Sequence, residues 1–200
     1  MRYGMVIDLK KCIGCMACTV ACKVENNTRR GVFWNTVKDM EFGKYPLVTR
    51  VFLPIQCMQC EKAPCIEVCP TGASYRRADG IVMIDSDKCV GCGYCVEACP
   101  YGARYLNRES GGYYGNILTP NEKLGYKQHK PGIAEKCTFC IHQLEQGEEP
   151  ICVRTCVGKA RYFGDLDDPD SEICQLINTK HGFQLNKDLG TNPSVYYLSA

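Results

Sequence analysis

The sequence predicts an α+β fold of short helices and strands that its cysteines hold together. The 200-residue chain has 17 cysteines, and an odd number argues against a framework of disulfides alone. All but Cys174 fall into four similarly spaced quartets. With only 6 Phe and 1 Trp for a hydrophobic core, metal binding is expected to supply part of the stability. The quartets are Cys12, Cys15, Cys18 and Cys22; Cys57, Cys60, Cys65 and Cys69; Cys89, Cys92, Cys95 and Cys99; and Cys137, Cys140, Cys152 and Cys156.

A strand is predicted at Tyr3–Leu9, leading into the first quartet. Its segment Met5–Asp8 recurs as Val82–Asp85, which leads into the third quartet. The chain therefore contains an internal repeat.

The third quartet has the most informative spacing. From Cys89 to Pro100 it reads C-x2-C-x2-C-x3-C-P, the bacterial ferredoxin run whose thiolates hold an iron–sulfur cluster. Gly91 and Gly93 allow the backbone to close around such a cluster. In two-cluster ferredoxins the last cysteine of a run binds the neighbouring cluster, so Cys99 is expected to serve a different quartet.

The other quartets are variants of this run. The first lacks the proline, the second widens the middle gap to four residues, and the fourth widens it to eleven. A single C-x2-C pair is also half of a zinc site, but the C-x3-C ending occurs in all four quartets and favours iron–sulfur clusters. The sequence has no C-x3-C-x2-C run for radical chemistry and no glycine-rich dinucleotide motif after a strand.

The segments that leave the quartets also repeat. Each is predicted to form a short helix, a turn and a strand. These segments are Cys65–Tyr75, Cys95–Tyr105 and, more weakly, Cys152–Tyr162.

Two long connections separate the quartets. Lys23–Gln56 contains a strand-like stretch at Leu47–Phe52, and Tyr101–Lys136 is expected to be irregular around the turn Gly111–Gly115. Connections of this length are either plain surface loops or surfaces that a partner covers, and the sequence leaves both open.

The C-terminal segment is predicted to form a helix and an extended tail. Helix-start residues occur at Asp168–Glu172, with Pro169 near the first helical position, and the helix is expected to end near Gly182. Cys174 is expected to be a free structural thiol. The tail Asn192–Leu198 is expected to be extended and to dock on a neighbour.

Charged residues near the cysteines allow two interpretations. Lys11, Lys88 and Lys136 each precede the first cysteine of a quartet, where a cation would raise the cluster potential. Alternatively they are exposed turn residues, and both interpretations stay open. The histidines at positions 129, 142 and 181 are expected to be ordinary polar residues.

Composition excludes some function classes. A formal net charge of +2 gives no argument for nucleic-acid binding. No apolar run reaches the roughly 20 residues of a membrane-spanning helix, so we expect no transmembrane segment. Asp8 occurs too early for a signal peptide.

On these motifs the chain resembles the iron–sulfur (beta) electron-transfer subunits of the dimethyl-sulfoxide-reductase family of molybdopterin oxidoreductases, the polysulfide, thiosulfate and arsenate reductase type. The resemblance rests on Met5–Asp8 before Cys12, on Cys-Pro-Thr-Gly-Ala after Val68, and on Lys136–Cys140. It continues past the last quartet in Phe163–Leu166.

The resemblance implies that four [4Fe–4S] clusters bind, each to three cysteines of one quartet and one of another. The implied ligand sets are Cys12, Cys15, Cys18 and Cys156; Cys137, Cys140, Cys152 and Cys22; Cys57, Cys60, Cys65 and Cys99; and Cys89, Cys92, Cys95 and Cys69. Nitrate-reductase relatives have Trp in the third quartet and form a [3Fe–4S] cluster, whereas this chain has Cys92. Two ferredoxin-like units are implied: residues 1–56 with 104–166, and an inserted unit at 57–103. Residues 167–200 would be the docking helix and tail.

The implied function is a non-catalytic relay of electrons between a large molybdopterin-containing subunit and a quinone-linked membrane subunit or another carrier. Molybdopterin is expected only in the partner. The alternative is a free-standing polyferredoxin. The implied location is the periplasm or the outer face of the cytoplasmic membrane, after export with the catalytic partner, with the cytoplasm as the alternative.

Overall fold

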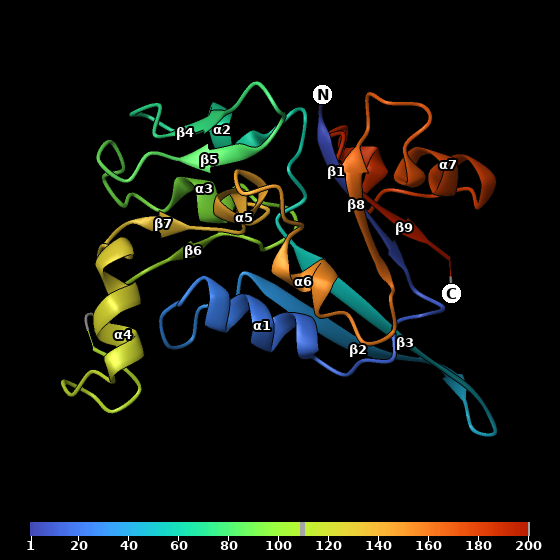
Figure 1. Ribbon diagram of the computed structural model, residues 1–200, viewed down its shortest axis with the longest axis horizontal. Coiled ribbons are helices and arrows are strands. Elements are labelled where there is room, and N and C mark those ends of the chain that lie inside the picture. The colour runs from blue at the N-terminus through green and yellow to red at the C-terminus, as the bar shows by residue number, and fades with distance from the viewer. Residues whose placement is uncertain (109–110, 200) are drawn as a thin grey trace.

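The computed structural model describes residues 1–108 and 111–199 as short helices and strands in four small sheets (Figure 1). The strands are β1 (Tyr3–Asp8), β2 (Asn35–Lys44), β3 (Leu47–Gln56), β4 (Ser74–Arg76), β5 (Val82–Ile84), β6 (Tyr105–Leu106), β7 (Ala134–Glu135), β8 (Arg161–Asp165) and β9 (Val195–Leu198). The helices are α1 (Ala17–Glu25), α2 (Pro64–Glu67), α3 (Tyr94–Glu97), α4 (Pro120–Gly125), α5 (Ile141–Leu144), α6 (Ile151–Arg154) and α7 (Glu172–Thr179), with 3₁₀ segments η1 (Tyr126–Gln128) and η2 (Lys187–Leu189). The mixed helix and strand content agrees with the predicted α+β class.

The largest sheet is β8-β1-β9, with β1 antiparallel to β8 and parallel to β9. Met5, Val6 and Ile7 of β1 are all fully buried. Val6 packs on one face with Ile173 of α7, whereas Met5 and Ile7 join the main core, which contains seven buried cysteines. Both faces of β1 are therefore covered, which explains why its buried residues do not alternate.

Strand pairing follows the order of the quartets. Each strand that enters a quartet pairs with a strand that leaves another: β1 with β8, β3 with β2, β5 with β4, and β7 with β6. The pair β5–β4 relates to the third and second quartets as β1–β8 relates to the first and fourth. The predicted helix, turn and strand after the second, third and fourth quartets are confirmed as α2–β4, α3–β6 and α6–β8.

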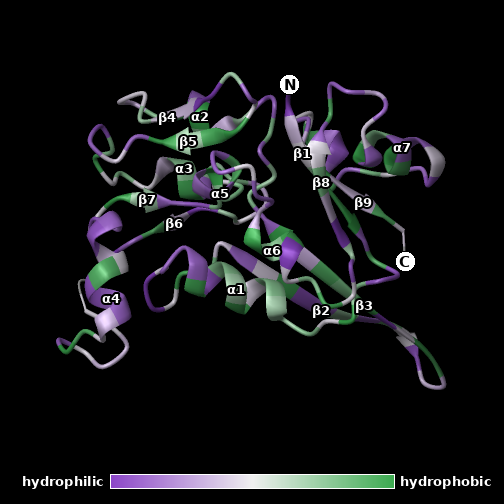
Figure 2. Ribbon diagram, in the orientation of Figure 1, coloured by the Kyte–Doolittle hydropathy of each residue, from purple (hydrophilic) through white to green (hydrophobic). Residues whose placement is uncertain are grey.

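The first long connection contains a hairpin, and the strand predicted at Leu47–Phe52 is confirmed as part of β3. β2 and β3 pair over ten residues each and project from the body (Figure 1). Apolar residues continue to the tip (Figure 2), where Tyr45 and Leu47 are 93% and 84% exposed.

The second long connection is more regular than expected. It carries β6, β7 and α4, and a capping box joins Thr119 to Glu122 at the start of α4. Thr119 Oγ1 accepts from the Glu122 amide at 3.3 Å, and the Glu122 carboxylate accepts from the Thr119 amide at 2.7 Å. Residues 109–110 of this connection lie outside the described residues, and the turn at Gly112–Gly115 is a tight bridge.

The C-terminal segment departs from the prediction in two ways. Ser171, not a residue near Pro169, caps α7 by accepting from the Cys174 amide at 3.4 Å, and α7 ends at Thr179 before Gly182. The tail packs on its own chain and not on a neighbour, because β9 pairs with β1 and Tyr197 is fully buried. The Tyr197 hydroxyl donates to the Pro54 carbonyl at 2.7 Å, which fixes the tail against β3. Within residues 1–108 and 111–199, no helix has the length and apolar character needed to span a bilayer.

Candidate iron–sulfur sites

The structure gathers cysteines of different quartets around three small cavities. Each cavity is lined by three cysteines of one quartet and the fourth cysteine of another. We call these sites 1, 3 and 4: site 1 is Cys12, Cys15, Cys18 and Cys156; site 3 is Cys57, Cys60, Cys65 and Cys99; and site 4 is Cys69, Cys89, Cys92 and Cys95.

The remaining four cysteines form site 2, which consists of Cys22, Cys137, Cys140 and Cys152. All four are buried, and burial together with the neighbouring Cys22, Cys140 and Cys152 thiols raises the pKa of Cys137. The Asn26 amide donates to Cys22 Sγ at 3.5 Å and to Cys140 Sγ at 3.9 Å, which joins the first quartet to the fourth.

Left-handed residues turn three cysteine loops into the helices that follow. Met16, Gly93 and Cys140 precede α1, α3 and α5 with φ of 61°, 83° and 52°. Gly91 also has a positive φ of 69°, and a Cβ there would lie 1.8 Å from the Gly132 carbonyl oxygen. The loop of site 4 can therefore close only because position 91 has no side chain.

Backbone amides point at the last cysteine of three quartets. The Ala103 amide donates to Cys99 Sγ at 3.5 Å, and the Ala160 amide donates to Cys156 Sγ at 3.2 Å. The equivalent bond to Cys69 Sγ comes from Ser74 at 3.4 Å. Burial raises the pKa of Cys69, but hydrogen bonds from the Ser74 amide, from Thr71 and from the Ala73 amide lower it by more, to about 7. The repeated exits thus position a donor that favours the thiolate.

Several of the buried cysteines have a pKa shifted in the opposite direction. Burial raises the pKa of the Cys152 thiol to about 11 and that of Cys60 to about 12, and it raises the pKa of Cys137 as well. Thiolates at these positions require a positive partner, which iron ions supply. A single zinc ion needs ligands that converge on one point. Among the described residues, no group of three or more Cys, His, Asp or Glu converges in that way. The donor set fits iron–sulfur clusters.

Two arginines beside the cysteines were missed by the sequence reasoning. Arg104 and Arg161 are 3% and 4% exposed, and each lies five residues after the last cysteine of a quartet, in an Ala-Arg-Tyr sequence. That repeat was the available signal. Of the lysines that precede a quartet, Lys136 is 2% exposed, whereas Lys88 is 65% exposed and pairs with Asp85. Lys11 is also exposed, and its ammonium group bonds to the Tyr162 hydroxyl.

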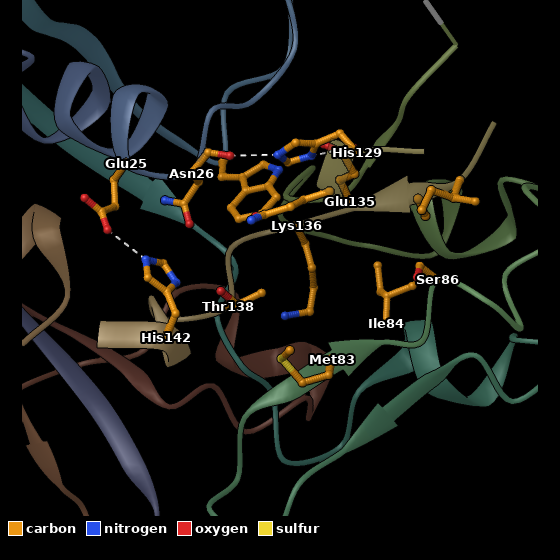
Figure 3. A pocket seen from close by; sticks show the side chains of 14 residues that line it. Glu25, Asn26, Met83, Ile84, Ser86, His129, Glu135, Lys136, Thr138 and His142 are labelled. Carbon is orange, nitrogen blue, oxygen red and sulfur yellow. Dashed lines mark hydrogen bonds and ion pairs between the residues drawn. The ribbon is translucent and has the colours of Figure 1, made fainter. Parts of the chain in front are cut away.

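A cavity of about 400 Å³ lies beside Lys136 (Figure 3). His129 is buried in its wall, with Nδ1 2.8 Å from Glu135 Oε1 and Nε2 2.7 Å from the Asn26 carbonyl oxygen. Burial lowers the pKa of His129, but the hydrogen bond and charge of Glu135 raise it by more, so the net direction is upward. This buried pair fixes β7, and therefore the approach to Cys137, against the end of α1.

Comparison with known proteins identifies the family. A model described as a 4Fe-4S dicluster domain matches residues 48–114 and 119–166, and a second with the same description matches residues 11–73. The chain is 47% identical to the B subunit of selenate reductase from Mesobacillus selenatarsenatis, over 100% of this chain and 72% of that protein. It is 43% identical to the B subunit of tetrathionate reductase from Salmonella typhimurium, over 98% and 72%. It is 39% identical to the arsenate respiratory reductase iron–sulfur subunit of a Shewanella species, over 99% and 96%. The predicted resemblance is thus confirmed, and the chain belongs to the family of 4Fe-4S dicluster proteins that serve as iron–sulfur B subunits of molybdopterin reductases.

Proposed function

We propose that the chain is the electron-transfer subunit of a molybdopterin oxidoreductase and that sites 1 to 4 each hold one [4Fe–4S] cluster. Clusters of this kind supply one-electron carriers when bound, and the protein sets their position and environment. The gathering of sixteen cysteines into four sets of four supports this proposal.

The order of the sites carries the proposal. The Arg161 guanidinium donates to Cys18 Sγ in site 1 at 3.5 Å and to Cys152 Sγ in site 2 at 3.8 Å. Gln59, which lies between Cys57 and Cys60 of site 3, donates to the Cys137 carbonyl of site 2 at 2.9 Å. Arg104 lines the cavity of site 3 and donates to the hydroxyl of Ser74, which lines the cavity of site 4. The sites therefore form a row in the order 1, 2, 3, 4.

Exposure of the cysteines changes along this row. The exposed cysteines are Cys15 in site 1 and Cys92 in site 4, whereas all four cysteines of site 2 are buried. A row with open ends and a buried middle is suited to receive electrons at one end and release them at the other.

We further propose that two ferredoxin-like units make up the chain, residues 1–56 with 104–166 and an inserted unit at 57–103, followed by residues 167–200. The matching pairs β1–β8 and β5–β4 support this division. In this proposal the chain performs no bond chemistry. Its partners are a large molybdopterin-containing subunit and a quinone-linked membrane subunit or another carrier. The proposed location is the periplasm or the outer face of the cytoplasmic membrane, with the cytoplasm as the alternative.

Anaerobic purification of the chain from its native source tests the proposed role. Co-elution with a large molybdenum-containing protein is expected, and fractionation of the same cells assigns the compartment. Elution as a lone small red-brown protein would instead support a free-standing polyferredoxin.

A further inference from the structure

We propose that three buried cations, Arg161, Lys136 and Arg104, raise the reduction potentials of the clusters on either side of them, with one cation at each junction of the row. The proposal rests on the four-cluster function above. It concerns residues that are not cluster ligands.

Arg161 occupies the junction between sites 1 and 2. Its Nη2 lies 3.5 Å from Cys18 Sγ and its Nη1 lies 3.8 Å from Cys152 Sγ, so one guanidinium donates to a cysteine of each site. Nη2 also donates to Asn35 Oδ1 at 2.9 Å and Nη1 to Gln56 Oε1 at 3.2 Å. These neutral acceptors hold the guanidinium in place without cancelling its charge.

Arg104 occupies the junction between sites 3 and 4. Arg104 lines the cavity of site 3, and its hydrogen-bond partner Ser74 lines the cavity of site 4, where the Ser74 amide donates to Cys69 Sγ at 3.4 Å. Its Nη1 donates to Ser74 Oγ at 2.7 Å, whereas Nε and Nη2 are buried and have no hydrogen-bond partner among the described residues. Because Arg104 also lines the cavity of site 3, these N–H groups are available to a ligand there.

The two arginines have equivalent places in the repeated segments, five residues after the last cysteine of a quartet. Cys18 and Cys152 are the third cysteines of their quartets, and so are Cys95 and Cys65. Arg161 therefore bridges the third cysteines of the first and fourth quartets. Arg104 lines the same cavity as Cys65, the third cysteine of the second quartet, and bonds to Ser74, which lines the same cavity as Cys95, the third cysteine of the third quartet. Both lie in Ala-Arg-Tyr segments, so the internal repeat places a buried arginine beside the cysteines twice.

Lys136 occupies the remaining junction, between sites 2 and 3. Its Nζ donates to the Cys137 carbonyl at 2.7 Å and to Gln59 Oε1 at 3.4 Å, and its side chain extends between Thr138 and Met83 (Figure 3). Gln59 lies between Cys57 and Cys60 of site 3, and its Nε2 donates to the Cys137 carbonyl at 2.9 Å. Lys136 is thus anchored both beside a ligand of site 2 and on the loop that carries two ligands of site 3.

The expected effect follows from charge. A cluster held by four thiolates has a net negative charge, because the thiolates outweigh its iron–sulfur core, and each added electron increases that charge. Neighbouring clusters therefore disfavour one another's reduction, most strongly where water is excluded. A buried cation between two clusters offsets this repulsion, and N–H donors to sulfur act in the same direction. Arginine keeps its charge at every working pH.

Redox titration followed by electron paramagnetic resonance, on the subunit purified with its partners, tests the proposal. The variants are Arg161→Gln, Lys136→Gln and Arg104→Gln. Each is expected to lower two of the four potentials, by a factor of about ten or more in the reduction equilibrium, which is about 59 mV for one electron. The pairs that shift for Arg161→Gln and Arg104→Gln should share no cluster, and Lys136→Gln should affect one cluster of each pair.

Two matched controls come from the other quartets. Lys11→Gln and Lys88→Gln remove a lysine at the same place in the sequence, directly before a first cysteine, but both lysines are exposed. In both control variants the reduction equilibrium of each cluster should stay within about threefold of its native value, because water screens exposed charges. In Arg161→Lys and Arg104→Lys the reduction potentials of the two neighbouring clusters should stay close to their native values, because the positive charge is retained.

Iron content separates this proposal from the four-cluster function. With full iron in every variant, unchanged potentials in the three buried-site variants overturn the proposal while the four-cluster function stands. Equal shifts in the Lys and Gln variants at an arginine also overturn it, because charge would then not be the cause. If a Gln variant fails to bind iron, the conservative variant at the same position decides: Arg161→Lys, Arg104→Lys or Lys136→Arg. Full iron and native potentials in the conservative variant support the role of charge, and loss of iron in both variants contradicts it.

Discussion

Replacing Cys99 by serine separates position in the sequence from position in space. Cys99 belongs to the third quartet, yet it lines the cavity of site 3 with Cys57, Cys60 and Cys65. Serine keeps the size of the side chain and can still accept from the Ala103 amide, which lies 3.5 Å from Cys99 Sγ. The substitution therefore removes one thiolate from site 3 and leaves the four cysteines of site 4 in place.

The expected magnitude is a loss of one to four irons out of about 16 per chain, since a [4Fe–4S] cluster uses four cysteines and site 3 would have three. Iron analysis measures this loss, and electron paramagnetic resonance identifies the cluster. Cys60→Ser provides the reference spectrum for damage at site 3, and Cys92→Ser provides it for site 4. Cys174→Ser is the matched control, because its thiol lies 3.5 Å from the Leu166 carbonyl and outside all four sites.

The Cys99→Ser spectrum should match that of Cys60→Ser. A match to Cys92→Ser would mean that Cys99 binds the cluster of its own loop, and the assignment of cysteines to sites 3 and 4 would be wrong.

Three further predictions follow from the same structure. Gly91→Ala should abolish the site 4 cluster, because the new Cβ would lie 1.8 Å from a backbone carbonyl, whereas Gly72→Ala, with a similar positive φ but no atom within 4 Å, should keep all iron. Ile173→Ala should lower the free energy of unfolding by about 3 kcal/mol, measured by thermal denaturation, because this fully buried side chain joins α7 to the main sheet; a change below about 1 kcal/mol would show that α7 packs elsewhere. The Glu135 contact raises the pKa of His129 above its unfolded value, so its contribution to stability is complete below about pH 6.5 and is lost as pH rises through the folded pKa. The melting temperature of the native chain should therefore fall more between about pH 6 and 8.5 than that of His129→Gln, and parallel curves would refute the pairing.

Much of the site could be predicted from local sequence, because cysteine spacing is a local constraint. The run Cys89–Pro100 specifies a loop that closes around a cluster, and the repeated Ala at positions 103 and 160 marks the amide that bonds the last cysteine. The strands β1 and β3 were also predictable, since their apolar residues lie close to the quartets that they enter.

Other features depend on contacts between distant residues and could not be predicted in this way. The tail was expected to dock on a neighbour, but its β9 pairs with a strand 190 residues earlier, Met5 lying opposite Val195. The hairpin β2–β3 is stabilised by ten paired positions, and no turn motif in the sequence predicts this pairing. Burial of Lys136, in contrast to Lys88, is set by packing around Gln59, and a lysine before a cysteine looks the same in both sequences.

The most direct test of the account is a count of iron and acid-labile sulfide in the anaerobically purified chain. Four clusters on sixteen cysteines predict about 16 irons and about 16 sulfides per chain. A content of about eight irons, or zinc in place of iron, would contradict the proposed four-cluster subunit.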